Sequence, residues 1–329
     1  MLKEHQIRPK ELYREYIRLA LIDAYAMGNA RHSIPCPGCG SEQCLLAFEK
    51  YQFQYEKCGK CHTLFCNPRP TRGDLDFFYK EGPAAQFWYE VIWPQVEETR
   101  RAEIFVPRVE EILKYCDQNI IRLQKVLDIG AGNGIFLEEF RKKMPSLEYR
   151  AIEPGSKSIA KCRERNLQCY QATVENVRDL DEWADLAICF EVIEHSHDPE
   201  KFISSIYKTL ADQGIALITC LNYQGADMRI LKERSSQVLP PLHLNFMSLT
   251  GYRNLFARCG FREIDIISPG KLDLDILSNA FAEGVVDERD LGPFMSWMIT
   301  QADTPIRDKF QKYLAESGMS SHIWIWAKK

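Results

Sequence analysis

Residues 126–134 read VLDIGAGNG, an apolar run that ends in an acidic residue followed by alternating glycines. An apolar run that passes at once into glycines is typical of a buried strand turning directly into a helix. Gly130, Gly132 and Gly134 permit a tight turn and let a ligand approach the backbone closely. The spacing G-x-G-x-G differs from the G-x-G-x-x-G that seats a dinucleotide pyrophosphate on a helix N-terminus.

The sequence around this turn alternates apolar strands with amphipathic helices. We expect strands at 125–130, 148–153, 186–191 and 214–220, and helices near 134–144, 156–165, 199–210 and 248–259. The last residues, HIWIWAKK (322–329), predict one more strand after a largely helical insertion at 270–316. This alternation predicts an α/β fold with a mostly parallel sheet covered by helices on both faces.

A second acidic position lies at the end of the next expected strand. Glu153 follows Gly134 by about 20 residues, and a carboxylate there can accept both hydroxyls of an adenosine ribose. The glycine loop alone is weak support for a nucleoside site. The loop, its place after a strand and the distant acid together make a simple tight turn the less favoured alternative.

These residues resemble the class I S-adenosylmethionine-dependent methyltransferases over roughly residues 123–267. Asp128–Gly134 matches their first motif, Ile152-Glu153-Pro154 their ribose-binding acid, and DLAICFEVIEHSHDP (185–199) the next strand and loop. The resemblance implies a Rossmann-like sheet of seven strands with the last antiparallel, and S-adenosylmethionine at the carboxyl ends of the first strands. It also implies the cofactor-binding residues, which are Asp128, Gly130, Ala131, Gly132, Gly134, Glu153, Pro154, Thr173, Val174, Phe190 and Glu191. Thr173 and Val174 belong to the adenine loop, whereas Phe190 and Glu191 are expected beside the methionine part.

Two histidines are candidates for acid–base chemistry or acceptor contacts. His195 follows the 186–191 strand, and a histidine of near-neutral pKa is a suitable general base. The alternative is that Asp198-Pro199 caps the next helix and His195 only orders the loop. His197 is a weaker candidate in the same loop, and a packed or capping role for the other candidate, His243, is equally open.

The stretch PPLHLNFMS (240–248) around His243 resembles a segment of sugar methyltransferases that act on nucleotide-linked deoxysugars and carry an N-terminal zinc module. Carbon-methylating members have a tyrosine three residues before this histidine, where this chain has Pro240. Oxygen or nitrogen transfer is therefore at least as well supported as carbon transfer.

The region between the cysteines and the glycine loop is rich in aromatic residues. A helix is expected at 9–27 within an N-terminal segment (1–30), and a helical linker or lid at 76–122, interrupted at Pro94 and Pro107. Phe87-Trp88-Tyr89, Trp93 and Tyr223 could wall an acceptor pocket, although aromatic residues at helical spacing more often form core.

Six of the 12 cysteines fall between Cys36 and Cys66. Cys36, Cys39, Cys58 and Cys61 have the spacing of a four-cysteine zinc ribbon, which we assign to residues 31–75. Four thiolates close a tetrahedral zinc site, so the metal is expected to be structural; a rubredoxin-like iron site is the alternative. Cys44, Cys66 and His62 are spare, and the other six cysteines are expected in the core.

The composition limits the partners. The net charge of −4 and the mixed charges of the ribbon do not favour RNA. No apolar run is long enough to span a membrane, and the charged N-terminus predicts a cytoplasmic protein.

We expect methyl transfer by a 123–329 domain to a small polar acceptor, such as a nucleotide-linked sugar or a glycan or natural-product precursor. The alternatives are an RNA methyltransferase and a non-catalytic cofactor-binding scaffold; a homodimer stays open.

Overall fold

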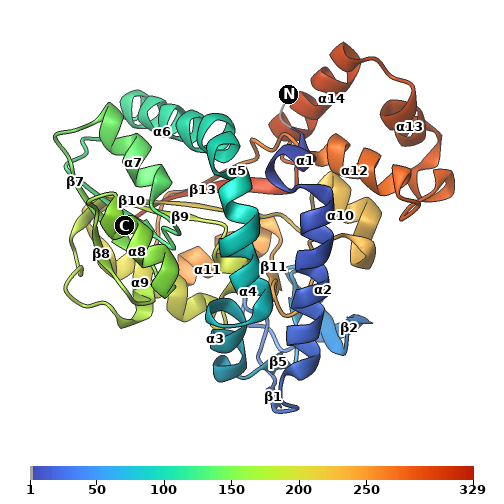
Figure 1. The fold of residues 1–329 in the computed structure, drawn as a ribbon, viewed down its shortest axis with the longest axis horizontal. Helices are drawn as coiled ribbons and strands as arrows, with labels where there is room; N and C mark the ends of the chain where they lie inside the picture. The colour runs from blue at the N-terminus through green and yellow to red at the C-terminus, as the bar shows by residue number, and fades with distance from the viewer. Residues whose placement is uncertain (1–2) are drawn as a thin grey trace.

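The computed structural model describes residues 3–329, and three sheets occur in that range. The central sheet has seven strands in the order β12-β13-β10-β9-β6-β7-β8 (Figure 1). Its strands are β6 (Lys125–Ile129), β7 (Glu148–Ile152), β8 (Gln168–Tyr170), β9 (Ala184–Phe190), β10 (Leu210–Leu221), β12 (Ile264–Ile267) and β13 (His322–Lys328). Strands β8, β7, β6, β9 and β10 are parallel, whereas β13 is antiparallel to both of its neighbours. The predicted mostly parallel seven-stranded sheet with an antiparallel last strand is confirmed.

Helices cover both faces of this sheet. The covering helices are α6 (Val106–Gln118), α7 (Ile135–Lys143), α8 (Ser156–Glu164), α9 (Pro199–Thr209) and α11 (Leu249–Arg258). Successive residues of β6 point to opposite faces, so Val126 packs in the cluster with α6 and α7 while Leu127 packs with α9 and α11. The central strands β6 and β9, which are covered on both faces, therefore consist mainly of apolar residues.

A long helical segment leads into the sheet. It consists of α4 (Pro83–Phe87), η1 (Trp88–Ile92), α5 (Trp93–Arg100), η2 (Arg101–Phe105) and then α6, where η1 and η2 are π-helical turns. The expected interruptions at Pro94 and Pro107 do not occur. Each proline lies in the first turn of the α-helical segment after a π turn, where a missing backbone N–H is tolerated. The π turns thus let the helix continue through both prolines.

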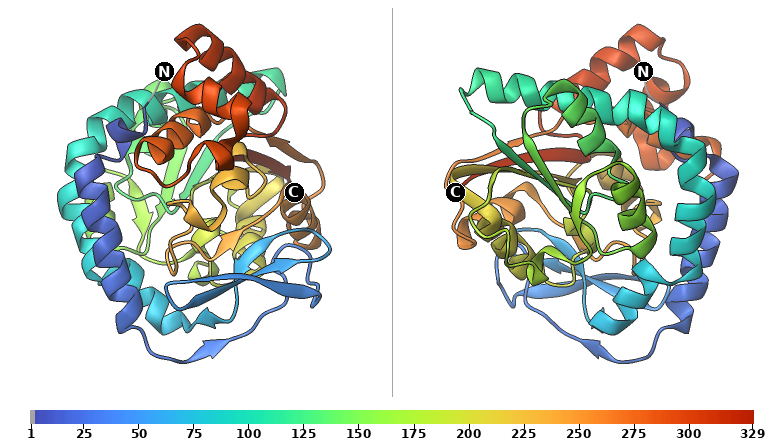
Figure 2. Two further views of the ribbon diagram at one scale, coloured as in Figure 1. Left: turned by 90° about the vertical axis from the view of Figure 1, so that its right-hand side faces the viewer. Right: turned by 60° about the vertical axis from the view of Figure 1, so that its left-hand side comes forward.

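Helices from both ends of the chain flank the carboxyl edge of the sheet. At the N-terminus these are α1 (Glu4–Ile7), α2 (Lys10–Ala26) and α3 (Arg72–Lys80), and α2 lies beside α4 and α5 (Figures 1 and 2). Between β12 and β13 the chain forms α12 (Asp273–Ala282), α13 (Glu288–Thr300) and α14 (Thr304–Glu316), and α10 (Ala226–Leu231) packs against α12. Short turns of 3-10 helix are η3 (Val174–Asn176), η4 (Ile193–His195) and η5 (Lys232–Arg234).

The cysteine-rich segment forms a small sheet of its own. Strands β2 (Cys44–Lys50), β3 (Phe53–Cys58) and β4 (Leu64–Cys66) are joined by β11 (Asn245–Phe246), in the order β11-β4-β3-β2. A pair of short strands, β1 (Arg31–His32) and β5 (Arg69–Pro70), brings the two ends of the segment together. In Figure 2 this sheet lies under the lower edge of the main domain. Because β11 belongs to the second half of the chain, the cysteine-rich segment and the domain with the seven-stranded sheet both contribute strands to this small sheet.

Two remaining sequence predictions concern the cysteines and the membrane. Of the scattered cysteines, Cys116, Cys162, Cys189 and Cys220 are buried, whereas Cys169 and Cys259 are half-buried. None of the helices within residues 3–329 is long and apolar enough to cross a membrane.

Candidate active site

One cavity opens where the N-terminal helices face the carboxyl ends of β6, β7 and β9. Its volume is about 520 Å³, within the range typical of sites for small ligands. The glycine loop, the ends of β7 and β9 and the adenine loop line one side. Helices α2 to α6 and the segment 237–243 line the other side. We call these the cofactor side and the acceptor side.

The glycine loop holds a left-handed backbone that only glycine adopts without strain. Gly130 and Gly132 have φ values of 76° and 53°. A Cβ added to Gly130 would lie 2.6 Å from Val192, whereas one added to Gly132 meets no atom within 4 Å. Gly132 therefore faces open space in the cavity, and a ligand can lie against its backbone. Ala131 lines the cavity beside it.

Gly134, which the resemblance assigns to the cofactor, does not line the cavity. It precedes α7 with a φ of 75°, and an added Cβ would lie 2.6 Å from Leu167 and 3.0 Å from Cys162. This glycine lets the helix start close against α8 and β8. Its contribution is to the shape of the turn.

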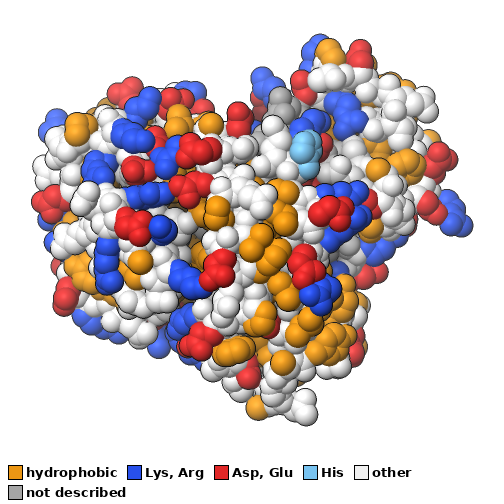
Figure 3. Space-filling view, viewed as in Figure 1, with side chains coloured by type: hydrophobic (Ala, Val, Ile, Leu, Met, Phe, Trp, Pro, Cys, Tyr) orange, Lys and Arg blue, Asp and Glu red, His pale blue; other side chains and the backbone are white. Residues whose placement is uncertain are grey.

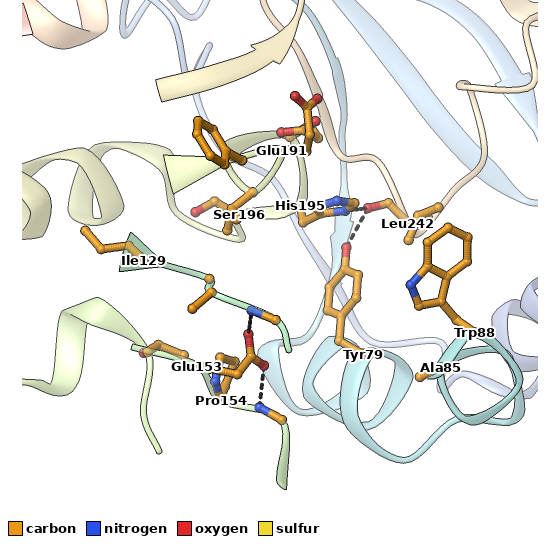
Figure 4. Close-up of a pocket in the computed structure, with 18 of the residues that line it drawn as sticks. Tyr79, Ala85, Trp88, Ile129, Glu153, Pro154, Glu191, His195, Ser196 and Leu242 are labelled. Atoms are coloured by element: carbon orange, nitrogen blue, oxygen red, sulfur yellow. Dashed lines mark hydrogen bonds between the residues drawn. The ribbon is translucent and has the colours of Figure 1, made fainter. Parts of the chain in front are cut away.

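Glu153 lies at the end of β7 and points toward the glycine loop (Figure 4). Its Oε2 accepts a hydrogen bond of 2.9 Å from the Gly132 N–H, and its Oε1 accepts one of 2.7 Å from the Gly155 N–H. The side chain is 5% exposed, and burial raises its pKa while the two amides oppose that rise. Each carboxylate oxygen keeps a second lone pair, so the group can accept two hydroxyl donors from a ribose.

The ends of β6 and β9 carry two further acids. Burial, followed by the charge of Glu153, raises the pKa of Asp128 to about 8. Burial alone would raise the pKa of Glu191 as well, but His322, Arg108 and Thr219 together hold it far below its usual range. Distances from Glu191 Oε1 are 2.7 Å to His322 Nε2, 2.6 Å to Thr219 Oγ1 and 3.4 Å to Arg108 Nη2. Glu191 is thus a fixed negative charge where a sulfonium would be stabilised.

The other assigned cofactor residues lie around these acids. Phe190 packs edge-on against Phe136 at 4.8 Å between ring centroids, with the Arg108 guanidinium 4.5 Å from its own centroid. Pro154, which directly follows Glu153, lines the cavity, as do Thr173 and Val174 at the start of η3. The structure therefore brings every assigned cofactor residue except Gly134 to the cavity.

His195 and His243 lie together on the acceptor side, with ring centroids 4.8 Å apart. His195 Nδ1 lies 2.6 Å from the Leu242 carbonyl, and His243 Nδ1 lies 2.6 Å from the Gln237 carbonyl. Since a carbonyl can only accept, both Nδ1 atoms carry the proton and both Nε2 atoms are free to accept one.

The two rings differ in how readily they can become charged. Burial lowers the pKa of His195, while the Leu242 carbonyl and Glu191 raise it again in part. Burial and then His195 lower the pKa of His243 to about 3. His243 thus stays neutral, and His195 is the better proton acceptor.

Glu194 joins the histidines in a compact group. Its side chain is 1% exposed, and burial and then Glu191 raise its pKa well above the usual range. Ligand atoms of Glu194, His195 and His243 all lie within 4.8 Å of one another, a spacing that a divalent cation could also accept. In the protonated form that burial favours, Glu194 is neutral.

The rest of the 194–199 loop is tied to the ribbon and the next helix. His197 Nε2 lies 3.1 Å from the Pro70 carbonyl, and the His197 ring packs against His32. Asp198 Oδ1 accepts a hydrogen bond from Lys201 N, with Pro199 in the first turn of α9. Asp198-Pro199 does cap the helix, while His195 remains directed at the cavity.

The acceptor side is walled by aromatic and basic side chains. Of the aromatic residues proposed from sequence, Trp88, Tyr89 and Trp93 line the cavity, whereas Phe87 and Tyr223 pack elsewhere. Sequence patterns did not assign several other lining residues to the site, among them Arg8, Tyr13, Tyr16, Tyr79, Arg100 and Arg108. Figure 4 shows the Tyr79 hydroxyl beside His195 at the same carbonyl, donating to Leu242 O at 2.6 Å.

The four assigned metal-site cysteines converge. The Sγ atoms of Cys36 and Cys61 are 3.5 Å apart, as are those of Cys39 and Cys58, and all four lie within 4.8 Å of one another. Tetrahedral zinc with Zn–S bonds of about 2.3 Å requires sulfurs about 3.8 Å apart, so the group fits this ion. Cys44, Cys66 and His62 are not part of the cluster.

The ribbon contacts the segment that carries His243. The Tyr55 hydroxyl donates to the His243 carbonyl at 2.7 Å, and the Ser248 hydroxyl donates to the Cys61 carbonyl. From the ribbon's exit, Arg69 donates to the His197 carbonyl at 2.6 Å and to the Asn245 side chain at 2.8 Å. The ribbon thus supports the backbone behind the acceptor side.

Curated proteins resemble about a third of this chain. The ubiquinone biosynthesis O-methyltransferase of Rickettsia akari is 28% identical over 119 residues, covering 35% of this chain and 46% of that protein. The protein of the same name from Bartonella bacilliformis is 28% identical over 102 residues, covering 30% and 41%. The chain therefore spans less than half the length of these curated relatives.

A solved structure shares the fold over a larger part of the chain. The plantazolicin methyltransferase BamL, solved with a triazolic desmethylPZN analogue and S-adenosylhomocysteine, covers 78% of this chain and 94% of its own, with 13% identity and a TM-score of 0.51. The sheet order, the antiparallel β13 and the glycine loop at the end of β6 define a class I S-adenosylmethionine-dependent methyltransferase. The chain belongs to the family described as methyltransferase domain, whose profile matches residues 97–265.

Proposed function

We propose that this protein transfers a methyl group from S-adenosylmethionine to a small polar acceptor bound beside His195. The observation that carries the proposal is a single cavity with Glu153 and the glycine loop on one side and two Nε2-unprotonated histidines on the other. Bound S-adenosylmethionine supplies an electrophilic methyl group, and the chain has to align the acceptor with it and remove a proton.

The residues that line the cavity fit these tasks. Glu153 would hold the ribose hydroxyls, the Gly132 backbone would lie against the cofactor, and Glu191 would provide negative charge near the sulfonium. His195 Nε2 would accept the acceptor proton as the new bond to the methyl carbon forms and the carbon–sulfur bond breaks. The Leu242 carbonyl keeps His195 in the tautomer that this step requires.

The acceptor class follows from the walls of the acceptor side. The flat aromatic rings of residues such as Trp88 and Trp93 can pack against sugars or heterocycles, which supports a nucleotide-linked sugar or a glycan or natural-product precursor. The curated relatives are named O-methyltransferases, which favours oxygen as the methylated atom. Pro240, in the place of the tyrosine of carbon-methylating sugar enzymes, points the same way.

We also propose that the four-cysteine cluster holds structural zinc. Four sulfurs leave no coordination position for water, and the cluster lies behind the His243 segment instead of in the cavity. RNA is the second candidate acceptor, since ribbons often contact nucleic acid. Acidic and basic side chains are intermixed on the face shown in Figure 3, which favours the small acceptor.

The test is a transfer assay with labelled S-adenosylmethionine against nucleotide-sugars, phenols and total RNA. We expect transfer to a small acceptor, and His195→Asn should reduce kcat by roughly 100-fold or more while S-adenosylhomocysteine still binds. His197→Asn, which alters a neighbouring ring tied to the Pro70 carbonyl, is the control and should keep most of the activity. Transfer to RNA alone would reject the small acceptor, and full activity of His195→Asn would reject the base.

A further inference from the structure

Three arginine side chains converge on the acceptor side. Arg8 lies between α1 and α2, Arg100 ends α5, and Arg108 belongs to the first turn of α6. All three line the cavity. Burial, followed by the charges of Arg8 and Arg108, lowers the pKa of Arg100 to about 9. Like charges are thus held close together at this end of the cavity.

Arg100 has no carboxylate partner among residues 3–329. The structure gives it one hydrogen bond, from Nη2 to the Ile7 carbonyl at 3.3 Å, while its buried Nε has no partner. The rings of Trp88 and Trp93 lie 5.6 and 5.3 Å from its guanidinium carbon. The next residue, Arg101, differs sharply, since it pairs with carboxylates of α5 and α7. Arg100 as a whole is half-buried, but its Nε is fully buried, and buried donors are normally paired, so the environment of Arg100 lacks an anion.

Carboxylates close to this group are already paired with the other two arginines. Arg8 lies 3.6 Å from Glu4 and over the ring of Tyr13, and Arg108 lies 3.4 Å from Glu191. Three guanidinium groups therefore share two carboxylates. Arg8 also contributes, after burial and His195, to the lowered pKa of His243, which places its charge near the histidines.

We propose that Arg8 and Arg100 bind an anionic group, a carboxylate or a phosphate, of the methyl acceptor. This inference rests on the proposed function and specifies its substrate class. A guanidinium offers paired donors that match the oxygens of either group. The rest of the acceptor would lie against the nearby rings of Tyr13, Tyr16, Trp88 and Trp93. The carboxylate of the cofactor is the competing source of the same chemistry, and Arg108, beside Phe190 and Glu191, is the arginine nearest to it.

The experiment titrates pyrophosphate and benzoate, as probes, into the full chain saturated with S-adenosylhomocysteine. At least one probe should bind the native protein, and Arg100→Met and Arg8→Met should each weaken it by roughly 10-fold to 100-fold. Arg100→Lys, which keeps the charge but loses the paired donors, should lie in between. Arg14→Met is the matched control, because it removes the same charge from the outer face of α2, where Arg14 pairs with Glu11 and Glu283. Its probe affinity should equal that of the native protein.

Titration of S-adenosylhomocysteine into the same variants separates the two sources. Its affinity should be unchanged in Arg8→Met and Arg100→Met; a tenfold loss would assign the arginines to the cofactor and overturn the inference. Absence of probe binding by a native protein that binds S-adenosylhomocysteine would overturn this inference alone. A native protein that does not bind S-adenosylhomocysteine would instead remove the proposed function.

Discussion

The two sides of the cavity are built in different ways. The cofactor side comes from one stretch, residues 128–191, and depends on backbone geometry: left-handed glycines, strand ends and one carboxylate held by two amides. The acceptor side gathers side chains from α2, α3, α5 and the 237–243 segment, which lie far apart in the sequence and are supported by the ribbon. A short motif can encode the first side, whereas only long-range packing creates the second.

The largest expected effect comes from closing the cofactor side. Gly132→Val places a branched side chain in the open space of the cavity and should weaken S-adenosylhomocysteine binding by roughly 100-fold or more, measured by calorimetry. Gly284→Val is the matched control, because Gly284 has a φ of 70° and also faces open space, but outside the cavity. Both variants bear a similar backbone strain of about 1–2 kcal/mol. Equal affinities of the two variants would show that the loop does not hold the cofactor.

Removing the metal should affect the acceptor side first. Cys58→Ser deletes one of four ligands, so the protein should lose its zinc, and amide hydrogen exchange should increase in residues 237–246. Affinity for S-adenosylhomocysteine should persist, because the hydrogen-bond partners of the glycine loop within residues 3–329, outside its own turn and α7, are Ile152, Glu153 and Cys162, none of which belongs to the ribbon. Cys44→Ser, in the same module but outside the cluster, should retain zinc. If cofactor affinity disappeared together with the zinc, the two sides would not be separable.

A smaller effect is expected at the carbonyl that orients His195. Tyr79→Phe removes the hydroxyl that donates to Leu242 O, and it should lower the free energy of unfolding by about 1 kcal/mol and kcat only a few-fold. The His195 Nδ1–H still donates to that carbonyl, so the tautomer is preserved. Tyr115→Phe is the control, since Tyr115 stacks on Trp326 away from the cavity. A loss of activity as large as that of His195→Asn would make Tyr79 a direct participant.

A further expected effect, on stability and not on activity, is a pH dependence that comes from His243. Its folded pKa is about 3, below the usual value of about 6.5, so below pH 6.5 the unfolded chain binds a proton that the folded chain does not. The free energy of unfolding should therefore decrease as the pH falls from about 6.5 toward 3. Denaturant titrations should show a smaller decrease for His243→Asn. The same slope in both proteins would mean that His243 is not buried neutral.

The contrast between the two sides also explains what the sequence could predict. The sheet, the glycine loop and Glu153 were predictable because a buried strand, a left-handed turn and a strand-end acid each restrict the local residue choice. The four cysteines converge as their spacing predicted. The convergence of His195 and His243, 48 positions apart, could be proposed only through resemblance.

The features that the sequence predicted wrongly or did not predict have local causes as well. Pro94 and Pro107 predicted helix interruptions. The helix instead continues through a π turn before each proline, and no residue pattern predicts a π turn. Tyr223 does not line the cavity. It packs against a cluster that includes ribbon residues, with Lys57 over its ring, and the sequence does not show which residues will pack against it in the fold. Arg8 and Arg100 look like ordinary surface charges in the sequence. Only the packing of α1 and α5 shows that one of them lacks a counterion.

The proposed function depends above all on binding of S-adenosylmethionine by the glycine loop and Glu153. The most direct test is calorimetric titration of S-adenosylhomocysteine into the native protein and into Glu153→Gln, with circular dichroism to show that both are folded. We expect one bound molecule per native chain and an affinity roughly 10-fold to 100-fold lower in the variant, because the amide cannot replace a carboxylate that accepts ribose hydroxyls. Equal affinities, or no binding by the native protein, would contradict the account.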